Sequence, residues 1–287
     1  MLAIIFGILA SFCFAAATVL AQRGLHLEPT PWGAWVTLAA NAAFLWVFHF
    51  LLYPSAPIFA VQNLTFVAVG LFVPGITRVL TFRGIRTLGS AITATVVNAT
   101  PMFSTVLAMV FLQERPGPLV LFGAALIVAG LIAITWERQR GSWKGSELIF
   151  PFLATLLFGM KDVTVRWGLG GSDSPVLAAA IAALTSTAEI FFILRYAQRE
   201  RFSLPAMSAM VWFTASGLFT GGSFLFMYLA LSMERVSVVG PLVNSYSVFV
   251  LLLAPFLARQ IETVTARKTA GAALVVLGIF LISAGKD

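Results

Sequence analysis

The sequence predicts an all-α membrane protein whose ten transmembrane helices form two inverted five-helix repeats. Composition is the first reason: the 287-residue chain is 60% hydrophobic and only 10% charged, whereas a soluble domain is roughly half apolar and a quarter charged. The second reason is that long apolar runs fill the whole chain, and the third is that its two halves repeat one pattern. With a mean hydropathy of +0.97, the chain is expected to be an integral, multi-pass membrane protein.

The chain contains ten apolar runs of the length that a membrane-spanning helix needs, about 20 residues. The runs are continuous, whereas barrel strands alternate over about 10 residues, and a helix satisfies its own backbone hydrogen bonds in lipid. Turn and charge residues separate the runs, as in EPTP at Glu28, QERPGP at Gln113 and GGSDSP at Gly170. The runs lie near residues 2–22, 33–53, 61–82, 88–111, 117–136, 147–168, 176–197, 208–231, 236–258 and 267–284.

The two halves of the chain carry the same pattern in the same order. GAALIVAGLIAI at Gly123 and GAALVVLGIFLI at Gly271 are identical at seven of twelve positions. The fourth run has VVN ending at Asn98, and the ninth has LVN ending at Asn244. Residues 1–140 and 141–287 are therefore expected to be two copies of one five-helix unit. Because five is odd, the second copy enters the membrane inverted, an architecture typical of secondary transporters.

The repeated stretch also contains paired glycines. Gly123 and Gly130 are seven residues apart, as are Gly271 and Gly278. Residues seven apart return to nearly the same face of a helix, and small residues on one face let two helix backbones approach closely in lipid. These glycines are expected to pack helices rather than to contact substrate.

The stretch NATPMFSTVLAMVFLQERPGPLVLFGAALIVAGLIAI, from Asn98 to Ile134, resembles the fourth and fifth helices of EamA-type transporters of the drug/metabolite transporter superfamily. The second copy departs from it, with Ser247 in place of Pro101 and with Glu262 lacking the adjacent arginine. The resemblance covers the whole chain. It implies a fifth and a tenth helix packed away from a central cavity. It leaves the substrate open among amino acids, nucleotide sugars, sugar phosphates and cations.

The sixth run contains three charged residues, Lys161, Asp162 and Arg166. Charges at membrane depth are costly and mark functional sites. Asp162 and Arg166 are four apart and are expected to pair on one helix face. Lys161 has no such local partner and is expected to bind an anionic group of the substrate. On this interpretation, removing Lys161 would leave the stability of the protein almost unchanged. Removing Arg166 would lower the stability, because Asp162 would be left unpaired.

Six further residues are candidates for substrate contact, because they are polar or aromatic and lie within the runs: Arg78, Glu189, Asn98, Asn244, Tyr246 and Tyr228. Each has a plainer alternative. An arginine late in its run can extend to the interface, and an asparagine can bond a neighbouring helix. Tyr228 and its repeat mate Phe82 can pack as aromatics. Glu189 is a candidate proton carrier or a partner of Lys161 or Arg78.

The function that these features favour is secondary transport, as an exporter or exchanger, of a small polar metabolite by alternating access around a midplane site. An amino acid or another carboxylate fits the basic residues best. Two alternatives stay open: a proton-coupled cation or drug exporter that uses Glu189, and a lipid flippase or non-transporting partner subunit. No enzyme activity or cofactor is expected, because the sequence contains no nucleophile–base set, no Walker loop and no dinucleotide-binding glycine pattern. No metal is expected, because one cysteine and two histidines cannot form a typical structural zinc site. The expected partners are a small-molecule substrate and membrane lipids, without nucleic acid, and a homodimer is left open.

The distribution of basic residues between the connections predicts the orientation. An excess of Lys and Arg in short loops marks the cytoplasmic side. The odd-numbered connections hold twelve such residues, whereas the opposite side holds only Arg115, Arg235 and Lys286. Both termini are therefore expected outside, in the periplasm of a bacterial inner membrane. The twelve are Arg23, Arg83, Arg86, Arg138, Arg140, Lys144, Arg195, Arg199, Arg201, Arg259, Arg267 and Lys268.

Overall fold

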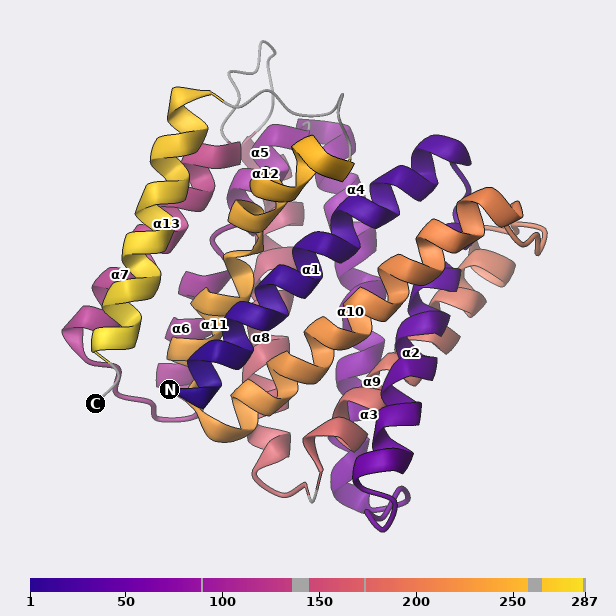
Figure 1. The fold of residues 1–287 in the computed structure, drawn as a ribbon, viewed down its shortest axis with the longest axis horizontal. Coiled ribbons are helices and arrows are strands. Elements are labelled where there is room, and N and C mark those ends of the chain that lie inside the picture. Colours follow the sequence, from indigo (N-terminus) through magenta and orange to yellow (C-terminus); the bar gives the residue numbers. More distant parts are fainter. Residues whose placement is uncertain (89, 136–144, 173, 258–264, 286–287) are drawn as a thin grey trace.

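The computed structural model describes residues 1–88, 90–135, 145–172, 174–257 and 265–285, without the side chains of residues 74, 75, 78, 82, 90, 91 and 254–257. All regular elements in these ranges are helical (Figure 1). The first repeat contains α1 (Leu2–Leu27), α2 (Trp32–Leu52), η1 (Val61–Asn63), α3 (Leu64–Leu71), η2 (Phe72–Ile76), α4 (Thr77–Leu88), α5 (Ser90–Val97), α6 (Thr100–Phe111) and α7 (Pro118–Thr135). The second contains η3 (Gly145–Leu148), α8 (Ile149–Leu169), α9 (Pro175–Phe192), η4 (Ile193–Ala197), α10 (Met207–Met233), α11 (Val236–Asn244), α12 (Tyr246–Leu257) and α13 (Ala266–Ala284).

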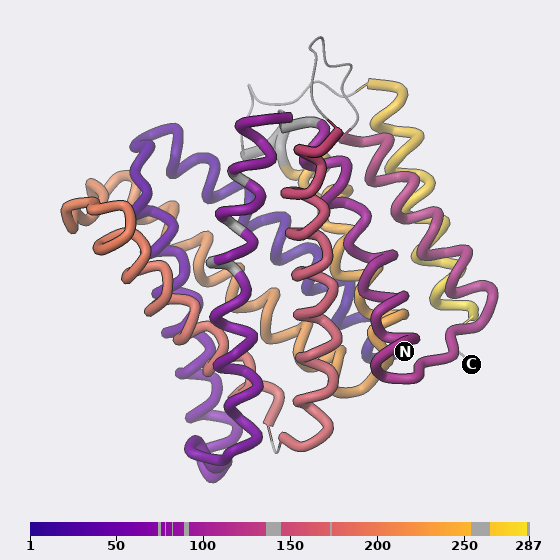
Figure 2. Tube along the Cα trace, turned by 180° about the vertical axis from the view of Figure 1, so that it is seen from behind, coloured from indigo at the N-terminus to yellow at the C-terminus, as the bar shows by residue number. Residues whose placement is uncertain are grey.

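The helices confirm the predicted membrane architecture. Among the described residues, nine helical stretches are long and apolar enough to cross a membrane, and the third predicted run is a broken helix whose first part is the shorter apolar stretch Val61–Leu71. Both termini lie at the same end of the bundle, as Figure 2 shows from the side opposite to Figure 1. An even number of passages requires this arrangement.

The third passage breaks at Val73, which has the extended backbone angles φ −131° and ψ 121° between α3 and α4. The cause is Pro74, because a proline disfavours the helical conformation in the residue before it. The break frees backbone carbonyls that lipid cannot satisfy. The hydroxyl oxygen of Ser186 on α9 lies 3.0 Å from the carbonyl oxygen of Gly70 and 2.9 Å from those of Val73 and Ala182, so its single proton is shared among the three. A side chain of the second repeat therefore stabilises the break in the first.

The fourth and ninth passages break at matching places. α5 ends one residue before Asn98, and α11 ends at Asn244. Thr155 of α8 lies beside the first break, and its hydroxyl proton is shared between the carbonyl of Pro151, at 2.7 Å, and that of Val96, at 3.2 Å. At the second break, Ser245 shares a hydrogen bond of 3.1 Å with Ser11 on α1. The repeat seen in the sequence is thus also a repeat of helix irregularities.

α7 and α13 lie side by side at the edge of the bundle (Figure 1). Their glycines meet reciprocally. A Cβ atom on Gly123 would lie 2.7 Å from the Gly278 carbonyl oxygen, and one on Gly130 would lie 2.5 Å from that of Gly271. The reverse approaches, from Gly278 and from Gly271, are 2.6 and 2.7 Å. The packing role predicted for these glycines is confirmed, and the repeated stretch forms one of the contacts between the two halves of the chain.

Glu114, in the connection between α6 and α7, reaches across to the second repeat. Its carboxylate accepts from the backbone N–H of Val236 at 2.8 Å, from the N–H of Ser237 at 3.0 Å and from the Ser237 hydroxyl. A carboxylate at this position satisfies the free N–H groups at the start of α11 and complements the helix dipole. The acidic residue of the QERPGP turn is thus an N-terminal cap for a helix of the other half.

Candidate functional site

α8 places three charged side chains at the interface between the repeats. It packs against α3, α4, α5 and α6 of the first repeat and against α10 and α11 of the second. Gly159 lets α6 approach closely, because a Cβ atom there would lie 3.0 Å from the backbone nitrogen of Ser104. Lys161 follows two residues later, about 18 Å along α8 from its start at the usual helical rise. Side chains at such an interface are placed where inverted-repeat transporters bind substrate.

Lys161 forms an ion pair with its neighbour Asp162. Lys161 Nζ lies 2.8 Å from Asp162 Oδ1, and the two side chains are 14% and 6% exposed. Adjacent helical residues point about 100° apart, but the flexible stem of a lysine lets its ammonium reach round. Lys161 Nζ also lies 3.7 Å from the sulfur of Met227 on α10. The sequence does not predict this contact, because nothing around Met227 distinguishes it from a core methionine.

Arg166 does not pair with Asp162, so the predicted pairing was wrong. Arg166 Nη1 instead donates to the backbone carbonyls of Leu231 at 2.7 Å and Ser232 at 3.1 Å. These residues belong to the last turn of α10, whose carbonyls have no partner within the helix. A basic group there also complements the negative end of the helix dipole. Arg166 therefore acts as a cap that ties α8 to α10.

This contact predicts that Arg166→Gln lowers stability by about 1.5–3 kcal/mol, the range for hydrogen bonds to charged groups. Ligand binding should change little, because the Lys161–Asp162 pair remains. Thermal denaturation of the purified variant beside wild type measures the first effect. Arg166→Lys is the matched control, since it keeps a cation near the carbonyls. An Arg166→Gln protein that melts normally but no longer binds ligand would place Arg166 in the substrate site.

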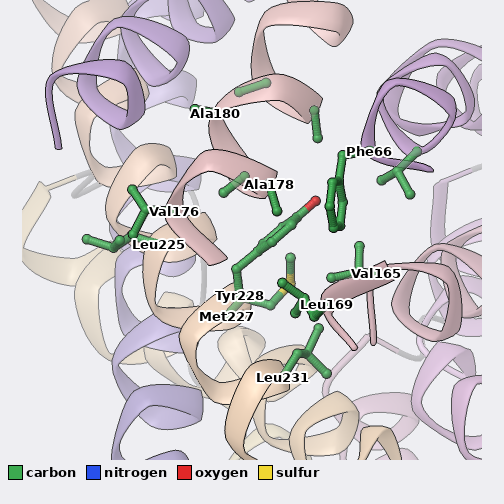
Figure 3. Close-up of a cluster of buried hydrophobic side chains, with 14 of the residues drawn as sticks. Phe66, Val165, Leu169, Val176, Ala178, Ala180, Leu225, Met227, Tyr228 and Leu231 are labelled. Carbon is green, nitrogen blue, oxygen red and sulfur yellow. The ribbon is translucent and has the colours of Figure 1, made fainter. Parts of the chain in front are cut away.

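Tyr228, on α10, is fully buried in an apolar cluster between several helices. Its ring centroid lies 6.3 Å from that of Phe66 on α3. Figure 3 shows its hydroxyl beside Phe66, with Ala178 and Val165 close by. The hydroxyl has no hydrogen-bond partner among the described residues. The aromatic packing considered for Tyr228 is what the structure shows, and substrate contact stays a prediction.

The two repeat-related asparagines both donate hydrogen bonds to other residues of the bundle. Asn98 Nδ2 donates to the Leu131 carbonyl at 3.4 Å and to the Thr135 hydroxyl at 3.1 Å, both on α7. Asn244 Nδ2 donates to the carbonyl of Gly240 at 2.8 Å, one turn earlier in α11. Asn98 thus makes the helix-to-helix bond that was its alternative reading, and Asn244 bonds within its own helix.

The remaining candidates are Tyr246, Glu189 and Arg78. Tyr246 stacks edge-on against Phe14 of α1, with ring centroids 4.8 Å apart. Glu189 is half-buried in α9. It was a candidate partner of Lys161, but the carboxylate that forms an ion pair with Lys161 is that of Asp162. Arg78 belongs to α4, but its side chain lies outside the described residues, as does that of Phe82. Among the residues that the structure describes, no three His, Cys, Asp or Glu side chains are grouped to hold a metal ion.

Comparison with known proteins identifies the family. The model of the EamA-like transporter family matches the chain twice, at residues 1–136 and 145–284. The chain belongs to the EamA-like transporter family. A search of curated protein sequences finds no match. A solved structure described only as "Crystal structure of protein" superimposes on this EamA-like protein with a TM-score of 0.81, at 16% identity, over 99% of this chain and 96% of that one.

The double match confirms the two-repeat organisation of this EamA-like protein, and the structural likeness confirms its fold. The family consists of membrane transporters of the drug/metabolite type rather than enzymes. The site on α8 is therefore a candidate for substrate recognition.

Proposed function

We propose that the protein is a secondary transporter that exports or exchanges a small metabolite bearing a carboxylate or another anionic group. The observation that carries this proposal is the Lys161 ammonium, held 2.8 Å from Asp162 at the interface between the repeats. An ammonium has three donors. Within the described residues, one goes to Asp162 and one makes a weak contact with the sulfur of Met227. A donor remains for a ligand.

Lys161 is favoured over Arg166 as the anion-binding group because the Arg166 guanidinium is held by two backbone carbonyls. The Lys161–Asp162 pair carries no net charge, which lowers its cost at membrane depth. An incoming carboxylate would accept a hydrogen bond from the remaining donor of Lys161 and would share its positive charge with Asp162, so the loaded site would carry one net negative charge. The two inverted repeats would then rock around this point, so that the site opens to each side of the membrane in turn.

A ligand screen on matched variants tests the proposal. The purified protein is melted with amino acids, short dicarboxylates, sugar phosphates, nucleotides and organic cations, because a bound ligand raises the melting temperature by mass action. An anionic ligand should stabilise wild type but not Lys161→Met/Asp162→Asn, in which both charges are absent. Stabilisation by organic cations alone, abolished by Glu189→Gln and retained in the double variant, would contradict the proposal and support a cation exporter.

The orientation of the chain is a separate prediction, with both termini outside in the periplasm of a bacterial inner membrane. It rests on the twelve basic residues in the odd-numbered connections against three on the other side, because short-loop Lys and Arg stay in the cytoplasm. Alkaline phosphatase fused after Asp287 should be active, and green fluorescent protein fused at the same place should be dark. The opposite pair of results would reverse the orientation.

A further inference from the structure

A cavity of about 740 Å³ is lined by residues of α1, α2, α4, α9 and η4 and of the connection between α1 and α2. In Figure 1 this connection lies at the end of the bundle opposite to the termini. The cavity is bounded by the end of α1, the start of α2, one face of α4, and the end of α9 with η4. Its walls are mainly apolar and include Leu25, Val79, Ile190 and Leu194. A second cavity, of about 240 Å³, shares Leu25 and other lining residues with it and extends the apolar space toward Phe213.

Two arginines, one turn apart on α4, stand on the wall of this apolar space. Arg83 and Arg86 both line the larger cavity and are exposed. Arg83 lies over the ring of Phe150, 5.0 Å from its centroid. Among the described residues, neither guanidinium has a carboxylate within ion-pair distance. Two cations beside an apolar cavity, with no protein anion, match a ligand that combines a negative head with a hydrocarbon body.

This cavity is distinct from the site on α8. Phe150, which stacks on Arg83, lies at the start of α8, eleven residues before Lys161. At the rise of an α-helix, this separation is about 16 Å along the helix axis.

From the arginine pair and the apolar cavity we infer a binding site for an anionic phospholipid between α1, α2, α4 and α9. The phosphate would accept hydrogen bonds from Arg83 and Arg86, and an acyl chain would occupy the apolar space that continues toward Phe213. Basic pockets between transmembrane helices are known to bind anionic lipid headgroups. The position at the end of the bundle suits the interfacial depth of a headgroup. A small soluble anion would leave the apolar part of the cavity unfilled. The inference does not depend on the substrate proposed above.

The test compares lipids on the full chain in a neutral detergent. Native mass spectrometry and melting temperature are measured with short-chain phosphatidylglycerol, with phosphatidylcholine of the same chains, and with glycerol phosphate. Phosphatidylglycerol should bind and stabilise, whereas the other two should not. Arg83→Gln/Arg86→Gln should weaken phosphatidylglycerol binding about thirtyfold, because each basic residue near a membrane surface contributes about 1 kcal/mol, or fivefold, to anionic lipid affinity.

Two matched variants complete the test. Arg199→Gln/Arg201→Gln removes two exposed cations from the connection between η4 and α10, outside the cavity, and should leave binding unchanged. Ala34→Leu narrows both cavities while keeping Arg83 and Arg86, and should weaken binding without changing net charge. Equal binding of phosphatidylglycerol by wild type and Arg83→Gln/Arg86→Gln would overturn the inference. So would full stabilisation by glycerol phosphate, which would make this a site for soluble anions.

Discussion

Replacing Lys161 with methionine is expected to destabilise the protein strongly, and adding Asp162→Asn to the same chain should restore most of the lost stability. The single change leaves the Asp162 carboxylate, which is 6% exposed, without its cation. Removing one partner of a buried ion pair typically costs about 3–5 kcal/mol, because the remaining charge is uncompensated. Methionine keeps the length and apolar stem of lysine, so the loss of stability measures the effect of removing the charge. Thermal denaturation of both variants and wild type measures it.

Asp162→Asn alone is the control for this pair, since it leaves the Lys161 ammonium without its carboxylate and should also destabilise. The stabilities of wild type, the two single variants and the double variant form a double-mutant cycle, which gives the interaction energy between Lys161 and Asp162. If the double variant is as unstable as Lys161→Met, the two side chains do not stabilise each other and the ion pair is not the source of the effect. The predicted loss for Lys161→Met differs from the sequence-based expectation that Lys161 is dispensable for stability. The expectation that Arg166 is needed for stability stays, with the different reason that Arg166 caps α10.

A leucine at Gly130 should cause the second large loss, because it would force α7 away from α13. Even a Cβ atom there would lie 2.5 Å from the Gly271 carbonyl oxygen, and that neighbour is backbone, which cannot rotate aside. Gly130→Ala should cost about 1–3 kcal/mol, the usual cost of overpacking, and Gly130→Leu more. Gly271→Ala should cost about as much as Gly130→Ala, since the approach is reciprocal. Chemical denaturation in detergent gives all three values.

Gly117→Ala provides the matched control, at the residue immediately before α7. A Cβ atom at Gly117 would have the Gly285 carbonyl oxygen as its nearest neighbour, at an ordinary contact distance of 3.7 Å. This change should alter stability by no more than about 0.5 kcal/mol, as surface substitutions usually do. A Gly130→Ala protein as stable as the Gly117→Ala protein would show that α7 and α13 can separate freely.

The helices were predictable because lipid imposes one rule on all of them. Each passage must be long, apolar and internally hydrogen-bonded. The predicted run 208–231 is α10 (Met207–Met233), and the predicted run 117–136 is α7 (Pro118–Thr135). The break at Val73 has a local cause in the sequence, because Pro74 restricts its neighbour Val73 whatever the surroundings. The glycine contact followed from the spacing of seven and from the repeat itself.

The partners of the polar side chains were less predictable, because they depend on contacts far away in the sequence. Arg166 was assigned to Asp162 by helical spacing, but the carbonyls that it caps lie 65 and 66 residues further along. No pattern in the sequence around Arg166 indicates that the end of α10 packs beside it. Lys161 pairs with the adjacent residue Asp162, whereas side chains on a helix are expected to pair when they are three or four residues apart. The sequence left two roles open for Asn98, substrate contact and a hydrogen bond to a neighbouring helix, and only the position of α7 reveals that bond.

The pairing of α7 with α13 has a consequence for how the protein is made. α7 ends at Thr135 and α13 begins only at Ala266. At about 5–20 residues per second, ribosomes need roughly 7–26 seconds to synthesise the intervening chain. During that interval the glycine face of α7 is in the membrane without its partner, open to lipid, to a chaperone or to the same face of another nascent copy. Completion of the bundle therefore waits for α13, and a nascent chain released before that helix would expose a surface built to bind its own repeat.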